Sequence, residues 1–252
     1  MKKPFLYFIC IIASTLCLNA SIRSHFIVVN TSKQLAQSTQ EIASNYLLSY
    51  LYPHKKSLKE NIYNHLKILT KSLQTIAKNT NSKKTQALLS YFAIQKAEII
   101  NLLKKRPSLK IAKEMITLSE IFTEGSLSIS HHHSDHFSLR DVQRLETKDL
   151  EVVLNTIVKY YIATKVNSKN IPYSRKMTKA MQSFQVKLSH ILLYKHTKKT
   201  KKIHQSIMRS WRVIKHYLKR FKELSTPSIV SLYSHVMQTK INTLTQNYQI
   251  VQ

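Results

Sequence analysis

The chain has 252 residues, with 1 glycine, 5 prolines and 2 cysteines, and its 40 lysines and arginines outnumber 12 aspartates and glutamates, for a formal net charge of +28. So few turn-forming residues argue against an all-β fold and against the glycine-rich phosphate loops of P-loop and Rossmann proteins, which leaves a mainly helical chain. The charge predicts attraction to anions in general, but the lysines are spread along the chain, so we expect most of them on solvated helix faces and do not expect nucleic acid as a partner.

The N-terminus has the pattern of a Sec-type signal peptide. Lys2 and Lys3 precede an apolar run over residues 4–18, and Ala20 offers a small residue at the cleavage edge. We therefore expect residues 1–20 to be removed and the mature protein to be periplasmic or secreted. The apolar run is shorter than the roughly 20 residues of a membrane span. An uncleaved signal remains an alternative, and it would be the chain's only expected contact with a membrane.

Both cysteines, Cys10 and Cys17, lie inside this predicted signal. Lipidation at Cys17 is disfavoured because a bacterial lipobox needs a small residue before the cysteine, and Leu16 is not small. Cleavage after Ala20 would leave a mature chain without cysteine, and therefore without disulfides or thiol chemistry.

Residues 21–125 are expected to form a first helical module. Residues 30–32 (Asn-Thr-Ser) are cap-type residues, so we place the first long helix after them, over residues 35–51, and Pro53 ends it. Apolar residues at helical spacing predict three more helices. These cover residues 57–78, 84–105 and 107–122. Gly125 suits the C-terminal cap of the last helix.

Residues 126–138, with the sequence SLSISHHHSDHFS, separate the first module from a second and have an unusual composition. Neutral imidazoles bind zinc, nickel or copper, and a His-rich tract is a recognised metal-binding composition. The candidate ligands are His131, His132, His133, Asp135 and His136. Adjacent side chains cannot easily close one tetrahedral site, so a polar linker without metal is the favoured interpretation, and no cofactor is expected.

Residues 139–252 repeat the layout as a second helical module. The expected helices cover residues 139–166, 173–195, 202–221 and 229–252. In the first helix of each module, Ile42 aligns with Ile157 and Tyr46 with Tyr161 (157 − 42 = 161 − 46 = 115). Two amphipathic helices share some apolar positions by chance, so the repeat rests on the whole layout rather than on these identities.

Helices of about 20 residues joined by short turns pack antiparallel to their neighbours. We therefore predict an all-α protein with two tandem antiparallel four-helix-bundle modules after the signal peptide. One fused array of eight helices is the alternative.

This layout resembles a family of small exported proteins with two copies of the type IV pilus methyl-accepting chemotaxis transducer N-terminal domain. The resemblance covers nearly all of the mature chain. It rests on the order of signal peptide and two modules, on residues 40–47 (QEIASNYL), on residues 209–211 (RSW) and on the closing helix. It implies a helical sensor domain related to the periplasmic domain of nitrate and nitrite sensor kinases.

The arginines that such domains offer as anion-binding candidates are absent here. The family's first helix usually carries a box like Gly-Arg-Gln-Arg-Met-Leu-Ser-Gln, whereas residues 32–40 read SKQLAQSTQ and residues 147–155 read TKDLEVVLN. A guanidinium binds a planar anion bidentately and an ammonium does not, so nitrate binding is not carried over. Lys33 and Lys148 could supply charge there, but we expect both to be solvated.

The sequence contains no recognisable catalytic constellation. It has no serine in a glycine-flanked elbow and no His-Glu-x-x-His motif, and cleavage would remove both cysteines. We therefore expect a non-enzymatic periplasmic helical sensor or binding module for a small ligand, such as a small anion, or for an envelope protein partner. The alternative is an envelope structural or adhesion protein that holds acidic polymers through its basic surface.

Overall fold

The computed structural model describes residues 3–133, 137–167, 171–194, 197–221, 223 and 226–250, with side chains from residue 22 to residue 248 apart from residue 171. These residues form α-helices joined by turns and contain no strand, which confirms the predicted all-α class. The helices are α1 (Lys3–Leu51), α2 (Lys56–Asn79), α3 (Lys83–Lys104), α4 (Leu109–His132), α5 (Leu139–Val166), α6 (Ile171–Ile191), α7 (Lys198–Lys219) and α8 (Pro227–Ile250). In this part of the chain, no helix is both long enough and apolar enough to cross a membrane.

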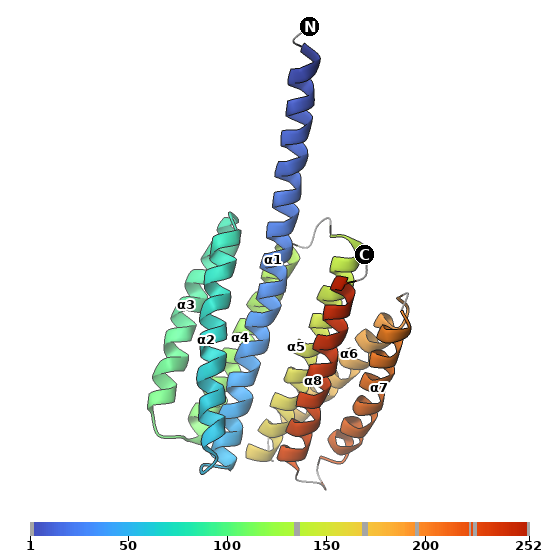
Figure 1. Ribbon diagram of the computed structural model, residues 1–252. Helices are drawn as coiled ribbons and strands as arrows, with labels where there is room; N and C mark the ends of the chain where they lie inside the picture. Colours follow the sequence, from blue (N-terminus) through green and yellow to red (C-terminus); the bar gives the residue numbers. More distant parts are fainter. Residues whose placement is uncertain are drawn as a thin grey trace.

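The helices form two neighbouring groups of four that meet along α1 and α5 (Figure 1). In the first group, α1 and α3 each contact both α2 and α4. In the second group, α5 contacts α6 and α8, and α7 contacts α8. At its N-terminal end α1 extends past the other helices, and its other end meets α2 at the opposite end of the molecule (Figure 1). We call residues 21–125 and 139–252 module one and module two throughout.

Several helix boundaries of module one recur in module two at one offset, and the offset is larger, 118 residues (227 − 109 = 118), for α4 and α8. Leu51 and Val166 end α1 and α5, Lys56 and Ile171 begin α2 and α6, and Lys104 and Lys219 end α3 and α7. Each of these pairs is separated by the offset of 115 residues that aligns Tyr46 with Tyr161. Figure 1 therefore shows two copies of one helical hairpin arrangement lying side by side.

Helices α1 and α5 run parallel, and residues that are nearly equivalent in the repeat lie beside one another. Lys33 contacts Asp149, and Gln40 contacts Thr156, and both pairs are 116 residues apart in the sequence. Because α2, α4 and α5 all pack against α1, its residues are buried on most sides from Val28 to Leu48. The result is one continuous hydrophobic core that includes Leu35, Ile42 and Tyr46 from α1 together with residues of both modules.

The predicted start of the first long helix is wrong. Residues 30–32 lie inside α1 instead of capping a helix at residue 35. The hydroxyl of Ser32 donates to the carbonyl of Val29 within the helix and lies 2.9 Å from the Ser130 hydroxyl, so its polar group is satisfied in a helical interior. The predicted signal peptide, residues 1–20, lies outside the residues whose side chains are described and stays a prediction.

The predicted end of the fourth helix is also wrong, because α4 continues to His132. Gly125 is therefore not a C-terminal cap, and residues 126–132 are helix rather than linker. Gly125 packs against Phe92, and an added Cβ at this position would lie 2.3 Å from Phe92 Cζ. The glycine thus permits close packing of α3 against α4 and does not form a turn.

Candidate functional site

The structure brings no three of the predicted metal ligands together within its described residues. His131 and His132 are exposed at the end of α4. His133 is buried, and its Nε2 lies 3.0 Å from the Thr85 hydroxyl at the start of α3. Asp135 and His136 lie outside the described residues, so the complete metal site stays a prediction.

Lys33 and Lys148 are not solvated as the sequence suggested. Lys33 is buried and forms an ion pair with Asp149 across the boundary between α1 and α5. Lys148 Nζ donates to Glu151 Oε2 at 2.7 Å, and the Glu151 side chain is fully buried. Lys33 faces module two because α1 and α5 pack against each other, whereas the partners of Lys148, Glu151 and Asn242, lie within module two. Single-helix periodicity reveals neither contact.

Polar side chains also join the modules at this junction. Gln40 Nε2 donates to the hydroxyls of Thr156 at 2.8 Å and Thr123 at 3.0 Å. Gln238 Nε2 on α8 donates to Glu41 Oε1 at 2.9 Å and also to Asn155. These polar groups hydrogen-bond largely to one another, so we infer that they fix the register of α1 against α5.

A serine and a lysine meet in the core between α4 and α5. Lys159 Nζ donates to Ser119 Oγ at 2.9 Å, and burial lowers the pKa of Lys159 to about 7. A neutral amine beside a hydroxyl is the arrangement of a general base and a nucleophile. Both residues are only 1% exposed, however, so a substrate has no access to them. We assign the pair to packing.

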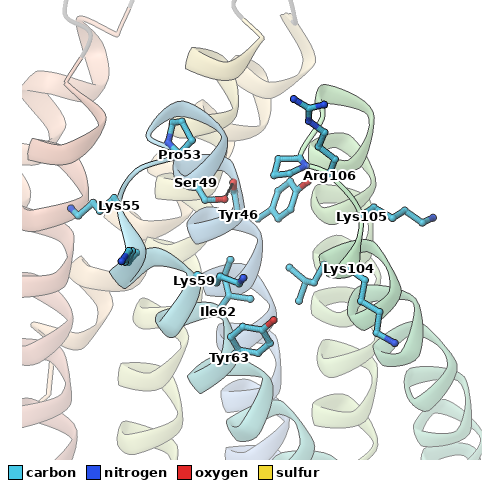
Figure 2. A pocket seen from close by; sticks show the side chains of 13 residues that line it. Tyr46, Ser49, Pro53, Lys55, Lys59, Ile62, Tyr63, Lys104, Lys105 and Arg106 are labelled. Atoms are coloured by element: carbon cyan, nitrogen blue, oxygen red, sulfur yellow. Dashed lines mark hydrogen bonds between the residues drawn. The ribbon is translucent and has the colours of Figure 1, made fainter.

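A cavity of about 560 Å³ opens at the end of module one that lies opposite the N-terminus (Figures 1 and 2). It lies where α1 turns into α2 and where α3 turns into α4. We call it the basic pocket. Its lining residues are Tyr46, Ser49, Pro53, Lys55, Lys56, Lys59, Ile62, Tyr63, Leu103, Lys104, Lys105, Arg106 and Pro107.

The charge of the basic pocket is uncompensated. Five lysines and one arginine line it, and no aspartate or glutamate does. Within the described part of the chain, none of these six cations forms an ion pair, whereas Lys33, Lys148 and Lys176 elsewhere do. Cations gathered at one end of the bundle without a carboxylate repel one another and favour binding of an anion.

The hydroxyl of Tyr46 is buried in the wall of this pocket. Tyr46 is 3% exposed, and its Oη lies beside the backbone amide of Ser108, but its own proton has no acceptor among the described residues. Burial raises the pKa of Tyr46, the interaction with the Ser108 amide opposes the rise, and Glu114 adds to it. The hydroxyl therefore stays protonated at neutral pH and can donate to a bound group.

Figure 2 shows how these side chains lie. Tyr46, Lys59 and Tyr63 are near the middle of the pocket, whereas Lys55 and Lys105 extend outward at its edges. The middle of the pocket is therefore mixed aromatic and cationic, and exposed ammonium groups lie at its edges.

The pocket also contains the N-terminus of α2. Lys55 is the residue before the helix, it makes no side-chain cap, and the first turn has no acidic residue. By contrast Ser82, Ser108, Ser138 and Thr197 cap α3, α4, α5 and α7 through their side chains. The first amides of a helix have no partner within it, so α2 presents free donors and the positive end of its dipole here.

No protein family, curated protein or solved structure matches this chain. The resemblance to the pilus transducer domain therefore stays a prediction. The chemistry of the basic pocket rests on the geometry of this chain alone.

The sequence contained a signal for the basic pocket that periodicity did not capture. The first turn reads Pro-His-Lys-Lys over residues 53–56, and the third reads Lys-Lys-Arg-Pro over residues 104–107. In an up-and-down bundle the first and third turns lie at the same end, so these two basic turns come close together in the fold.

Proposed function

We propose that this chain is a non-enzymatic, exported helical binding module that holds a small anionic ligand in the basic pocket of module one. The observation that carries the proposal is the pairing of six cations that form no ion pair among the described residues with the buried hydroxyl of Tyr46, whose proton has no acceptor there. A buried hydroxyl whose proton has no acceptor costs free energy in the unliganded protein. A ligand that accepts its proton removes that cost, which is a common reason for retaining such a group at a binding site.

Export is supported by the pattern of residues 1–20. Cell fractionation with mass analysis of the N-terminus tests it directly. We expect the protein in the periplasm or medium, beginning after Ala20. Recovery of a cytoplasmic protein that still carries residues 1–20 would contradict this part of the proposal.

Thermal unfolding with added anions tests binding, because a ligand that binds only the folded state raises the midpoint. Inorganic phosphate, sulfate, nitrate and nitrite are compared at one fixed ionic strength, which keeps general screening constant. We expect at least one anion to raise the midpoint in the wild type and in Lys71→Gln. The rise should be lost in Lys59→Gln.

Lys71 is the matched control, since it is an exposed lysine on the same helix as Lys59 but does not line the pocket. The two variants have the same net charge, so a difference between them reports the site. No rise with any anion, or equal rises in both variants, would overturn the proposal.

The second candidate function is retention of acidic polymers in the cell envelope. It is favoured by the position of Lys55, Lys104 and Lys105, whose side chains extend outward at the end of the molecule (Figure 2). Polymer binding should weaken steeply with salt. Binding to an acidic polymer that inorganic phosphate does not displace at equal ionic strength would favour this candidate.

A further inference from the structure

We infer that the ligand is an organic phosphate, a phosphate group attached to an apolar body, and that module one alone binds it, one molecule per chain. This inference rests on the proposed function and names the class and number of its ligands.

The donor set of the basic pocket fits a phosphate better than a planar anion. Planar carboxylates and nitrate are matched by the guanidinium fork, yet five of the six cations are lysines, which act as point charges. A phosphate carries up to two charges and has several acceptor oxygens that can be approached from different directions. Lysines from two turns, the uncapped N-terminus of α2 and the Tyr46 hydroxyl supply donors from separate directions.

The pocket also has an apolar part that a bare phosphate would leave unused. Ile62, Tyr63 and Leu103 line it between the two turns, and Pro53 and Pro107 flank them. Binding sites of about 300–1,000 Å³ that combine apolar walls with a few polar groups typically hold organic ligands. With about 560 Å³, the basic pocket has room for such a body beside the anionic group.

Module two provides an internal comparison, because the repeat aligns the pocket residues of α1, α2 and α3 with counterparts 115 residues later, and the offset grows to 118 where α4 and α8 begin. Four of the six cationic positions are no longer basic there. The counterparts of Lys55, Lys56 and Lys59 are Asn170, Ile171 and Ser174, and neither offset places a basic residue opposite Arg106. Of the two cations that remain, Arg220 is paired with Glu223 at 2.8 Å.

The tyrosines of the two modules have similar backbone neighbours. Tyr161 Oη accepts a hydrogen bond from the Thr226 amide at 3.3 Å, and the equivalent Tyr46 Oη interacts with the Ser108 amide. The counterparts of Ile62 and Leu103 are Met177 and Leu218, which line a mainly apolar groove between α6 and α7. Module two thus keeps the helix arrangement of the site but loses most of its charge, which assigns binding to module one.

Isothermal titration of the purified protein at fixed ionic strength tests the class of ligand. The probes are phenyl phosphate, inorganic phosphate and phenol. We expect phenyl phosphate to bind at one molecule per chain, about 10-fold or more tightly than inorganic phosphate, and phenol not to bind. A tenfold ratio corresponds to about 1.4 kcal/mol, a modest demand on the apolar walls.

The outcomes separate the two proposals. Equal affinity for phenyl phosphate and inorganic phosphate overturns the organic class but leaves the anion site. Binding of neither probe overturns the phosphate class, and the anion site itself is overturned only if no anion raises the unfolding midpoint. Two molecules per chain overturns the assignment to module one. Sedimentation with vesicles of phosphatidate, compared with vesicles of phosphatidylcholine, tests whether a lipid headgroup is the source of the phosphate. If it is, the protein sediments with the phosphatidate vesicles and phenyl phosphate releases it. If the protein does not sediment, a soluble phosphate is the source.

Variants locate the site. Tyr46→Phe, which removes only the hydroxyl, should weaken phenyl phosphate binding about tenfold, in line with the loss of one hydrogen bond to a charged group. Tyr161→Phe is its counterpart in module two and should leave the affinity unchanged. Unchanged affinity in Tyr46→Phe, or equal losses in both variants, overturns the assignment.

Discussion

Tyr46 and Tyr161 occupy equivalent positions in the repeat, yet their hydroxyl groups have opposite energetic roles. The Tyr46 proton has no acceptor within hydrogen-bond reach among the described residues and the Ser108 amide only partly satisfies its oxygen, whereas the Tyr161 hydroxyl accepts from the Thr226 amide. We expect Tyr46→Phe to raise the free energy of unfolding of the unliganded protein by about 1 kcal/mol and Tyr161→Phe to lower it by about 1 kcal/mol. Urea unfolding of the three proteins measures both changes. Destabilisation by Tyr46→Phe would show that the hydroxyl is structural.

Lys159 is a second residue whose environment predicts a measurable effect. Burial lowers its pKa from 10.5 to about 7, so between these values the unfolded chain binds more protons than the folded one. Stability must then rise with pH through this range, and below about pH 7 the cost of burying the charge is present in full. Replacing the lysine by methionine keeps much of the apolar side chain and removes the titration.

We therefore expect Lys159→Met to be more stable than the wild type at pH 7, by roughly 1–3 kcal/mol, with the advantage shrinking as the pH rises towards 10. Ser119 keeps a partner in the variant because its hydroxyl also donates to the Ile116 carbonyl. Urea unfolding of both proteins at pH 7, 8 and 9 tests this. A difference that stays constant over these pH values would contradict the depressed pKa.

At the scale of the helices, Gly125 shows how packing overrides local preference. Alanine favours a helix interior over glycine by about 1 kcal/mol, which alone would stabilise α4. A Cβ at position 125 would, however, lie 2.3 Å from the ring of Phe92, which is fully buried. We expect Gly125→Ala to lower the free energy of unfolding by about 1–3 kcal/mol, as overpacking does.

The double variant Gly125→Ala with Phe92→Leu is the control for this clash. If the steric contact is the cause, the double variant should lose less stability than the sum of the two single changes. Chemical denaturation followed by circular dichroism gives the values. Additive losses would place the cost of Gly125→Ala elsewhere.

The sequence predicted the interior of the helices well and several of their ends poorly, including the end of α6 at Ile191 and the start of α7 at Lys198, each four residues from its predicted place. The stripe of Leu58, Ile62, Leu69 and Ile76 on α2 is buried as its spacing predicts. Cap-type residues 30–32 and Gly125 were misleading because their role depends on neighbours from other helices. Ser32 meets Ser130 and Gly125 meets Phe92, and neither contact can be read from the local sequence.

At the scale of the whole molecule, one core and a polar junction connect the modules. The buried cluster is continuous, and ion pairs and hydrogen bonds cross between α1 and α5. We therefore expect the two modules to unfold in one cooperative transition. Trp211 is the only tryptophan and lies in α7, so its fluorescence reports module two, while circular dichroism reports both modules. Separate midpoints for the two signals would show that the modules unfold independently.

The position of the basic pocket follows from the same whole-molecule arrangement. Residues 53–56 and 104–107 are distant in sequence, and each alone resembles a solvated turn. Only the up-and-down order of the helices brings them together, and only the fold shows that Tyr46 lies between them with a proton that has no acceptor among the described residues. The cations could therefore be predicted from the sequence, but the Tyr46 hydroxyl, the donor that makes them a candidate site, could not.

Mapping amide chemical shifts by nuclear magnetic resonance during titration with phenyl phosphate would test the central claim most directly. The account predicts saturable changes concentrated on residues 55–63 and 104–108 of module one, with little change at residues 171–178 and 219–226 of module two. Changes spread evenly over both modules, or confined to exposed lysines without saturation, would contradict a ligand site in the basic pocket.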